Sequence, residues 1–408
     1  MLINRTQLAI LFLSIGFISC SKSGGGGGNT PPPPASLPAI TIEDLSLFEG
    51  NGGTNTFNVL IKLNAASSKT VSVTYSLQAG TAKAGDDFTA ATNQVLTFAA
   101  GESEKNIPVS IVADDIREGD ETFKVALTTP ENATLSRSTA TVTIRNDDTK
   151  VAFSNEGYEA ATSYPGYTLA WADEFNGPVL DATSWTHQNG DGCDLSICGW
   201  GNNELEYYTN RPENLFFQDG KLIIEARQEN FGTRNYTSSK ILTAGKKKFK
   251  FGRIDIRAKL PTGKGIWPAF WMLPQDNKYG GWPTSGEIDI MEVVAHDIVR
   301  THGTVHFGPG PGSTSVNRST TTAAGTLHDK FYVYSMEWEE DEIRWYLNDV
   351  LFSTFKKSDV PAGMIYPFNE DFYFIFNLAV GGNWPGSPDA TTYFPQWLIV
   401  DYIRVYQK

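Results

Sequence analysis

The chain lacks an excess of basic residues, and no long helical periodicity is evident in it. It carries 33 Lys and Arg against 46 Asp and Glu, a formal net charge of −13. Because binding to nucleic-acid phosphates requires a basic surface, this balance argues against a nucleic-acid partner. Gly and Pro are frequent, and short runs of alternating apolar and polar residues dominate. This pattern predicts an all-β protein, and a length of 408 residues suggests two or three domains.

The apolar run near the N-terminus is too short to span a bilayer securely. Residues 8–18 follow Arg5 and precede Cys20, which is the order of a targeting segment. Residues 1–20 resemble a bacterial lipoprotein signal, which implies that Cys20 is lipidated. The glycines and prolines of residues 21–37 then form a linker. We expect an exported protein that meets the membrane only through a lipid anchor, at the bacterial cell surface or outer membrane; ordinary secretion is the alternative.

Cysteine is scarce in the rest of the chain. Cys193 and Cys198 lie five positions apart in a loop rich in Gly and Asp. In an oxidising compartment, we expect this pair to form a disulfide that pins the loop. A metal site is the alternative, but it would need more sulfur or histidine ligands than lie nearby.

Residues 38–148 contain no Trp, Cys or His, so we do not expect an enzyme site there. Short alternating runs predict strands at 56–63, 70–76, 95–98, 105–112, 121–127 and 140–145. Acidic residues cluster at the predicted turns, as in Gly-Asp-Asp-Phe (85–88) and Asp-Asp-Ile-Arg-Glu-Gly-Asp-Glu (114–121). These stretches resemble a Calx-beta domain, an immunoglobulin-like β-sandwich. The resemblance implies calcium at one pole; the alternative is that the acids are solvated turn residues. We expect a spacer or accessory module.

Residues 285–294, Ser-Gly-Glu-Ile-Asp-Ile-Met-Glu-Val-Val, combine β-branched residues with three carboxylates. The composition predicts a strand, but burying charge without a partner costs several kcal/mol, so a purely structural strand should not look like this. Glu287 and Asp289 are two positions apart and share one face. Glu292 lies at an odd offset from Glu287, and a β-bulge near Met291 would return it to that face. The three acids would then line one cleft.

Two close carboxylates suit retaining glycoside hydrolysis. One attacks the anomeric carbon and the other protonates the leaving oxygen, at a separation of about 5–5.5 Å. A third acid between them fits a helper that shares a proton with the nucleophile. A solvent-facing acidic edge and a cation site are the alternatives.

The sequence Glu-Ile-Asp-Ile-Met-Glu resembles the signature of glycoside hydrolase family 16 in its bulged form. Further stretches look like the laminarinase branch of that family in order and spacing, namely 201–209, 267–274, 280–283, 377–386 and 400–406. The resemblance covers residues 166–408, which leaves 149–165 as a linker. It implies a concanavalin-like β-jelly-roll of two antiparallel sheets and endo-hydrolysis of β-1,3-glucan with retention, without a cofactor for catalysis. Carried over by position, Glu287 is the nucleophile, Asp289 the helper and Glu292 the acid/base.

Aromatic residues suit a sugar cleft, because an indole ring buries about 150–250 Å² against an apolar face. Core packing is the common fate of a Trp, but the motifs place Trp267, Trp271 and Trp282 beside the acids, so we favour substrate stacking for these three. The family pattern also favours function for His306, which a hairpin would bring near the carboxylates, whereas the other histidines are expected to be structural. Asn203 is a candidate sugar ligand. Arg257 could contact sugar or pair with acids.

The resemblance also implies a structural calcium site on the convex side of the second domain, away from the cleft. The expected ligands are the Glu174 carboxylate, the Gly220 carbonyl and the Asp401 carboxylate. Mixed carboxylate and carbonyl oxygens suit Ca²⁺. Binding would cross-link the first and last strands of the domain and stabilise the fold by mass action.

Three functions therefore compete. The first is a lipid-anchored endo-β-1,3-glucanase, expected to be a monomer. The second is an enzyme acting on mixed-linkage β-1,3-1,4-glucan or on a galactan, and a neutral, Trp-rich cleft favours glucan over a sulfated galactan. The third is a surface glycan-binding or adhesion protein. Glu287 and Glu292 argue against the third, because binding alone does not require both.

Overall fold

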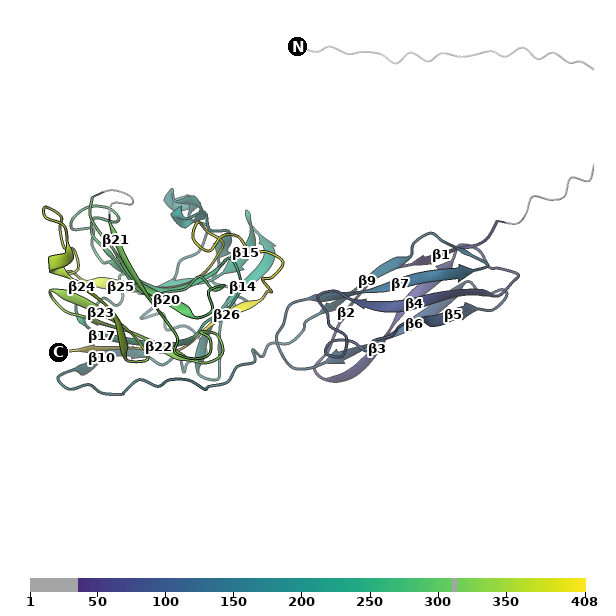
Figure 1. The fold of residues 1–408 in the computed structure, drawn as a ribbon, viewed down its shortest axis with the longest axis horizontal. Coiled ribbons are helices and arrows are strands. Elements are labelled where there is room, and N and C mark those ends of the chain that lie inside the picture. Colours follow the sequence, from purple (N-terminus) through teal and green to yellow (C-terminus); the bar gives the residue numbers. More distant parts are fainter. Residues whose placement is uncertain (1–35, 310–313) are drawn as a thin grey trace, which may run out of the picture.

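The computed structural model describes residues 36–309 and 314–408 (Figure 1). The predicted signal, the lipidated Cys20 and nearly all of the linker at 21–37 lie outside the described residues. Within the described part of the chain, no helix has the length and apolarity needed to cross a membrane. Two β-rich bodies follow one another along the chain, as the all-β prediction required.

The N-terminal body is a sandwich of two sheets. Their strand orders are β6-β3-β1-β8 and β2-β9-β7-β4-β5. Alternate residues of both sheets point inward and are buried, so one apolar core forms between them, with Phe88 stacked on Phe123. Each of the six predicted strands falls on an observed one, and three short strands were missed. The strands are β1 (Ala39–Ile42), β2 (Leu45–Phe48), β3 (Gly53–Leu63), β4 (Val71–Ala79), β5 (Gln94–Phe98), β6 (Glu104–Ala113), β7 (Glu121–Glu131), β8 (Thr134–Leu135) and β9 (Thr139–Arg145).

The C-terminal body stacks two larger sheets, in agreement with the predicted jelly-roll. One has ten strands, with β12-β15-β14-β26-β17-β22-β23-β24 in order, β10 beside β26 and β13 beside β14; the other is β11-β16-β25-β18-β19-β20-β21. Nearly all pairings are antiparallel, with β12 and β15 parallel. The strands are β10 (Thr168–Asp173), β11 (Thr186–His187), β12 (Glu206–Tyr208), β13 (Leu215–Gln218), β14 (Lys221–Phe231), β15 (Arg234–Ser238), β16 (Lys240–Leu242), β17 (Gly252–Lys259), β18 (Ile266–Pro274), β19 (Glu287–Glu292), β20 (Arg300–His306), β21 (Ser315–Thr321), β22 (Tyr332–Trp338), β23 (Glu342–Leu347), β24 (Val350–Lys356), β25 (Phe372–Val380) and β26 (Gln396–Gln407); the short 3-10 helices are η1 (Cys193–Leu195), η2 (Cys198–Gly201) and η3 (Lys357–Asp359).

The core between these sheets decides which side of the seven-stranded sheet is free for a site. On β18, Phe270 and Met272 are buried in the core. Because successive strand residues face opposite sides, Trp267 and Trp271 point away from the core, to the open face of the sheet. The other strands of this sheet follow the same alternation, except at a bulge in β19.

Residues 149–165, predicted to be a linker, are attached to the C-terminal body over much of their length. Val151 is buried with Phe331, Tyr158 donates its backbone N–H to the Phe331 carbonyl at 3.0 Å, and the backbone N–H of Ala160 donates to the Tyr402 hydroxyl at 3.0 Å. In Figure 1 the segment runs along the outer side of that body. It therefore covers part of the ten-stranded sheet on the side away from the cleft.

Candidate active site

A cleft of about 620 Å³ lies on the open face of the seven-stranded sheet. Its floor is formed by outward-facing residues of β18, β19, β20 and β25, and one wall comes from the loop that contains η2. The three predicted catalytic acids, the three favoured tryptophans and His306 all line it. Alternation on the strands and pairing between them bring these residues together.

The acids share the cleft because β19 is bulged. Against β18, Phe270 pairs with Met291 but the next residue, Trp271, pairs with Asp289, so β19 contains one extra residue. Against β20, Asp289 pairs with Thr304 and Glu292 with His302. Three steps on β19 thus match two on its neighbour, which confirms the predicted bulge. Glu292 therefore returns to the face that carries Glu287 and Asp289.

Trp345 of β23, in the ten-stranded sheet, supports the bulge from the core side. Its indole N–H donates to the Asp289 backbone carbonyl at 2.9 Å, across the gap between the two sheets. The close approach depends on Gly303 of β20, where a Cβ atom would lie only 2.5 Å from the Trp345 ring. Trp345 is 1% exposed and belongs to the core between the two sheets. The bulge is thus fixed by packing from the other sheet.

Each of the two outer acids is held by an indole. Trp282 donates to Glu287 Oε2 at 2.7 Å, and Trp267 donates to Glu292 Oε1 at 3.2 Å. The Thr304 hydroxyl lies 3.4 Å from the second oxygen of Glu292 and donates to it. Donors directed at both carboxylates fix their orientation and favour their ionised forms.

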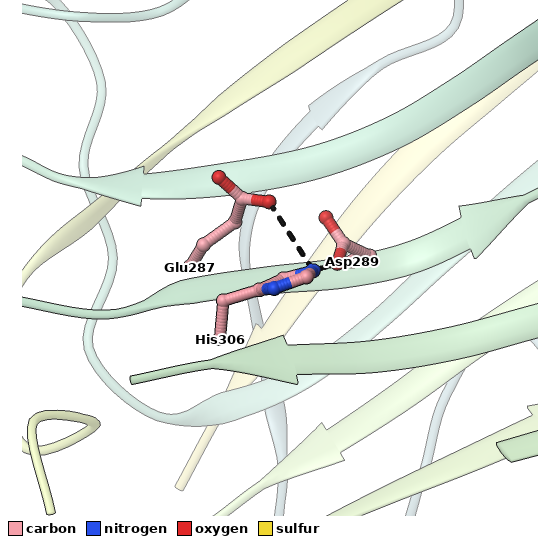
Figure 2. A group of neighbouring side chains, drawn as sticks. All are labelled: Glu287, Asp289 and His306. Atoms are coloured by element: carbon pink, nitrogen blue, oxygen red, sulfur yellow. Dashed lines mark ion pairs between the residues drawn. The ribbon is translucent and has the colours of Figure 1, made fainter. Parts of the chain in front are cut away.

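His306 lies between Glu287 and Asp289 (Figure 2). Its Nε2 atom is 3.6 Å from Glu287 Oε1 and 3.3 Å from Asp289 Oδ2. The β19–β20 pairing places it directly opposite Glu287, as the predicted hairpin required. Asp289 is 3% exposed, the most enclosed of the three acids.

Burial raises the pKa of all three carboxyls. It is the largest cause for Glu287, where the negative charge of Asp289 raises the pKa further and His306 opposes the rise. The same pattern holds for Glu292, where the indole of Trp267 and the hydroxyl of Thr304 also oppose the rise. For Asp289, burial is the cause. Ionisation of all three carboxyls would place like charges close together at a high electrostatic cost. The group of three therefore retains protons near neutral pH.

Several cleft residues were not singled out by the sequence. Trp200, which directly precedes the 201–209 stretch, forms part of the cleft wall. The Lys240 ammonium lies 4.1 Å from the centre of the Trp200 ring and 5.1 Å from that of Trp271. Lys240 lies on β16, and only the pairing of β16 with β25 reveals its place in the cleft. Asn377 on β25, which opens the 377–386 stretch already marked in the sequence, also lines the cleft and accepts a hydrogen bond from the Trp271 indole at 2.8 Å.

The disulfide between Cys193 and Cys198 is present, as predicted. Ile197 lies inside the loop that it closes and Trp200 follows two residues after Cys198, and both line the cleft wall. The structure therefore connects this cross-link to the shape of the cleft.

Two other predicted contacts lie elsewhere. Asn203 is exposed and donates to the Asn383 side chain at 2.8 Å, and its neighbour Asn202 lines the cleft instead; a sugar contact by Asn203 stays a prediction. Arg257 is 1% exposed on β17, in the ten-stranded sheet. It donates to the Asp401 carboxylate at 2.5 Å and to the Tyr158 carbonyl at 2.7 Å. Of the two roles predicted for Arg257, the structure shows pairing with an acid rather than a place in the cleft.

Both carboxylates among the predicted calcium ligands are paired with basic side chains. Arg404 donates to both oxygens of Glu174, at 2.7 and 2.8 Å. Asp401 pairs with Lys221 at 2.7 Å as well as with Arg257. Calcium binding by Glu174, Gly220 and Asp401 would require these cations to withdraw, so the site stays a prediction.

The N-terminal body contains two clusters of acidic side chains. The structure brings together Glu49, Asp147 and Asp148, and separately Asp87, Glu118 and Glu121, with one oxygen of each residue within 4.8 Å of the others in its group. Burial is the largest cause raising the pKa of Glu49 to about 7. Clusters of this kind suit a cation with oxygen ligands, and calcium there stays a prediction.

Comparisons with known proteins agree with this geometry. Residues 202–397 match the family described as Glycosyl hydrolases family 16, and residues 40–148 match the Calx-beta domain. A Glucan endo-1,3-beta-glucosidase A1 of Niallia circulans is 42% identical over 267 residues, 60% of this chain and 38% of that protein. A Beta-glucanase of Rhodothermus marinus is 41% identical over 263 residues, 62% of this chain and 89% of that protein.

Among solved structures, the laminarinase catalytic domain from Thermotoga maritima is similar, with a TM-score of 0.57 and 44% sequence identity. The match covers 59% of this chain and 98% of that domain. The similarity therefore covers nearly all of the compared domain and over half of this chain.

Proposed function

The chain belongs to glycosyl hydrolases family 16, and we propose that it is an endo-1,3-β-glucanase that cleaves laminarin-type glucan with retention of configuration. The observation that carries the proposal is the bulged strand β19, which places Glu287 and Glu292 on one face with Asp289 between them. The relatives named as glucanases support β-1,3-glucan as the substrate.

In the proposed mechanism, Glu287 attacks the anomeric carbon while Glu292 gives its proton to the departing glycosidic oxygen. Glu292, now ionised, takes a proton from water, whose oxygen attacks the same carbon and releases Glu287. Two inversions at one carbon give net retention. Asp289 and His306 lie beside Glu287, where they fix its orientation and share the group's remaining proton.

The walls of the cleft fit a neutral polysaccharide. Trp200, Trp267, Trp271, Trp282 and Trp384 all line it. Indole faces pack against the C–H faces of sugar rings, and this packing needs no charge on the substrate. Apart from the acids and Lys240, the lining offers few charged groups. A sulfated galactan would require basic residues along its path.

The test uses the full chain with laminarin, mixed-linkage β-1,3-1,4-glucan and agarose, with products followed by mass and by anomeric NMR. We expect rapid release of β-anomeric β-1,3-oligosaccharides from laminarin. Glu287→Ser should abolish turnover and preserve glucan binding. Cleavage of another glycan but not of laminarin would move the substrate and keep the mechanism. Binding without cleavage of any of the three would favour a glycan-binding protein.

We also propose that Cys20 is lipidated and anchors the enzyme at the cell surface. The sequence of residues 1–20 supports this, together with the Gly- and Pro-rich segment that follows. In a bacterial host, Cys20→Ser should move the protein from the membrane fraction to the soluble fraction. Equal membrane association of the two forms would reject the anchor.

Calcium is proposed only as a stabilising ion. The grouped acids of the N-terminal body support a site there, and the family resemblance supports one at Glu174, Gly220 and Asp401. Removal of calcium with a chelator should lower the melting temperature and leave kcat unchanged at temperatures where the protein stays folded. An unchanged melting temperature would reject both sites.

A further inference from the structure

A row of hydrogen-bonding side chains leads from Glu292 across two neighbouring strands. The Thr304 hydroxyl donates to Glu292 Oε2 at 3.4 Å, and the Asn317 amide donates to that hydroxyl at 2.9 Å. The His302 Nδ1 atom lies 3.0 Å from the Asn317 amide oxygen. Glu292 is on β19, Thr304 and His302 are on β20, and Asn317 is on β21. The row therefore spans three adjacent strands.

Strand register places the row on the cleft side of the sheet. Glu292 is paired with His302 across β19 and β20, and Thr304 is paired with Asn317 across β20 and β21. Thr304 and Asn317 both line the cleft. The bulge that returns Glu292 to this face also brings it beside Thr304.

The direction of the bonds follows from the chemistry of each group. Because Asn317 uses its NH₂ group toward Thr304, its oxygen faces His302, and an amide oxygen can only accept. His302 must therefore carry a proton on Nδ1 and donate it. Thr304 accepts from Asn317, so its single hydroxyl proton is free for Glu292. Every donor in the row points toward the carboxylate, and bonds aligned in this way strengthen one another.

We propose that His302 is a positioning residue for Glu292, acting through Asn317 and Thr304. The row holds one carboxylate oxygen in place and stabilises the negative charge that Glu292 acquires when its proton passes to the leaving group. This inference rests on the acid/base role of Glu292 in the proposed function. It adds to that role a residue whose hydrogen bonding reaches the carboxylate through two other side chains.

Other groups also act on Glu292. The Trp267 indole on β18 donates to Oε1, the oxygen that Thr304 does not bind. Asp289, on β19 with Glu292, raises the pKa of Glu292, and His306 on β20 opposes that rise. The Thr304 hydroxyl also lowers the pKa of Glu292. Removal of the row should therefore raise the pKa of the acid and leave the influence of Asp289 and His306 unchanged.

His302 has a second contact that offers a competing explanation. Its ring meets the edge of Trp384 with centroids 4.9 Å apart, and Trp384 meets Trp267 in the same manner at 5.6 Å. His302 could thus serve only as packing for the rim of the cleft. The two roles require different properties of the side chain, an N–H group in one case and an aromatic ring in the other.

The experiment compares His302→Leu with His302→Asn in the full chain. Asn places an N–H donor near the position of Nδ1 but has no ring. We expect His302→Leu to lower kcat/KM on laminarin by about 3- to 10-fold, the usual effect of one hydrogen bond, and His302→Asn to stay within about twofold of the parent. On a 2,4-dinitrophenyl β-laminaribioside, whose leaving group needs no proton, neither should lower kcat/KM. The alkaline limb of the laminarin profile should move to higher pH in His302→Leu.

Ser319→Ala provides the matched control, because Ser319 lies opposite His302 on β21 and its hydroxyl accepts from Arg300 rather than from a member of the row. If His302→Leu folds poorly, Asn317→Leu provides a second test. It removes an exposed member of the row and should have the effect expected of His302→Leu. Equal losses in His302→Leu and His302→Asn, or equal losses on both substrates, would overturn the proposal. Glu292→Ala separates the two levels of inference: if its defect does not depend on the leaving group, the acid/base role itself fails.

Discussion

Arg117 of the N-terminal domain forms a two-point ion pair with Glu225 of the catalytic domain. Its Nε and Nη2 atoms donate to the two carboxylate oxygens at 2.6 and 3.1 Å. The Glu225 side chain is fully buried and also accepts from the Trp397 indole at 2.8 Å. The Arg117 guanidinium stacks over the Phe216 ring at 5.0 Å. A buried bidentate pair of this kind ties the N-terminal domain to the catalytic domain more firmly than a flexible linker would.

Arg117→Ala should uncouple the two domains. The substitution leaves Glu225 buried with Arg227 as its remaining basic partner. Loss of one partner of a buried pair costs about 3–5 kcal/mol, and Arg227 should reduce that cost. We expect calorimetry to resolve two unfolding transitions in the variant where the parent shows one.

Lys150→Ala is the matched control for this prediction. Lys150 lies in the same region and pairs with Asp115 at 3.1 Å, but both side chains are more than half exposed. Exposed pairs contribute about 0–1 kcal/mol, so this variant should unfold like the parent. Identical calorimetric traces for the two variants would show that the Arg117 pair does not couple the domains.

Trp282→Phe should alter the acid limb of the pH profile. The indole N–H of Trp282 stabilises ionised Glu287 and lowers its pKa. Phe keeps most of the ring but has no donor, so the pKa of the nucleophile should rise. Since the nucleophile must be ionised, activity should then be lost at a higher pH than in the parent as the solution is acidified. At neutral pH we expect kcat/KM to fall by about 3- to 10-fold.

Trp384→Phe tests whether that shift comes from the lost donor. Trp384 lines the cleft, and its ring contacts are to His302 and Trp267. Its replacement should weaken binding of laminarin and leave the acid limb in place. A shift of equal size in both variants would mean that the indole bond to Glu287 does not set the limb.

The features that sequence predicted best are those fixed within one strand. The two-residue period places Glu287 and Asp289 on one face, and a bulge places Glu292 with them, whatever lies beyond the strand. The same period puts Trp267 and Trp271, four positions apart on β18, on one face. A local pattern is sufficient here because the geometry that it describes is also local.

The residues that sequence missed depend on pairing between distant strands. His302 and Asn317 become neighbours only through the register of β20 and β21. The sequence left two roles open for Arg257, and only tertiary structure decides between them, because the segment at 149–165 covers that side of the sheet and supplies carbonyl partners for the guanidinium. No pattern within β17 shows which side another segment will cover.

Asp289→Asn should stabilise the protein at alkaline pH. Burial raises the pKa of Asp289 to about 8, well above its value in an unfolded chain, about 3.9. The folded state therefore binds the extra proton between these values, and the stability of the parent falls as the pH rises through this window. Asn does not ionise, so the variant should not lose stability in this way as the pH rises.

The measurement is thermal unfolding of parent and variant at pH 5 and pH 9. The melting temperature of Asp289→Asn should exceed that of the parent by more at pH 9, with about 2–4 °C for each kcal/mol in a domain of this size. Activity should fall at both pH values, since the helper carboxylate is lost. A difference in melting temperature that is the same at both pH values would contradict a raised pKa for Asp289.

Replacement of Cys193 and Cys198 by Ala should act on substrate binding rather than on the chemical step. The disulfide closes a short loop, and such a cross-link contributes about 2 kcal/mol by restricting the unfolded chain. The same part of the chain places Ile197 and Trp200 in the cleft wall. The catalytic carboxylates are instead on β19, which is paired with β20. We expect KM for laminarin to rise several-fold, with kcat within about twofold of the parent because the acids stay in place. Reduction of the parent with a thiol should reproduce the change, and a fall in kcat at constant KM would instead connect the loop to the catalytic acids.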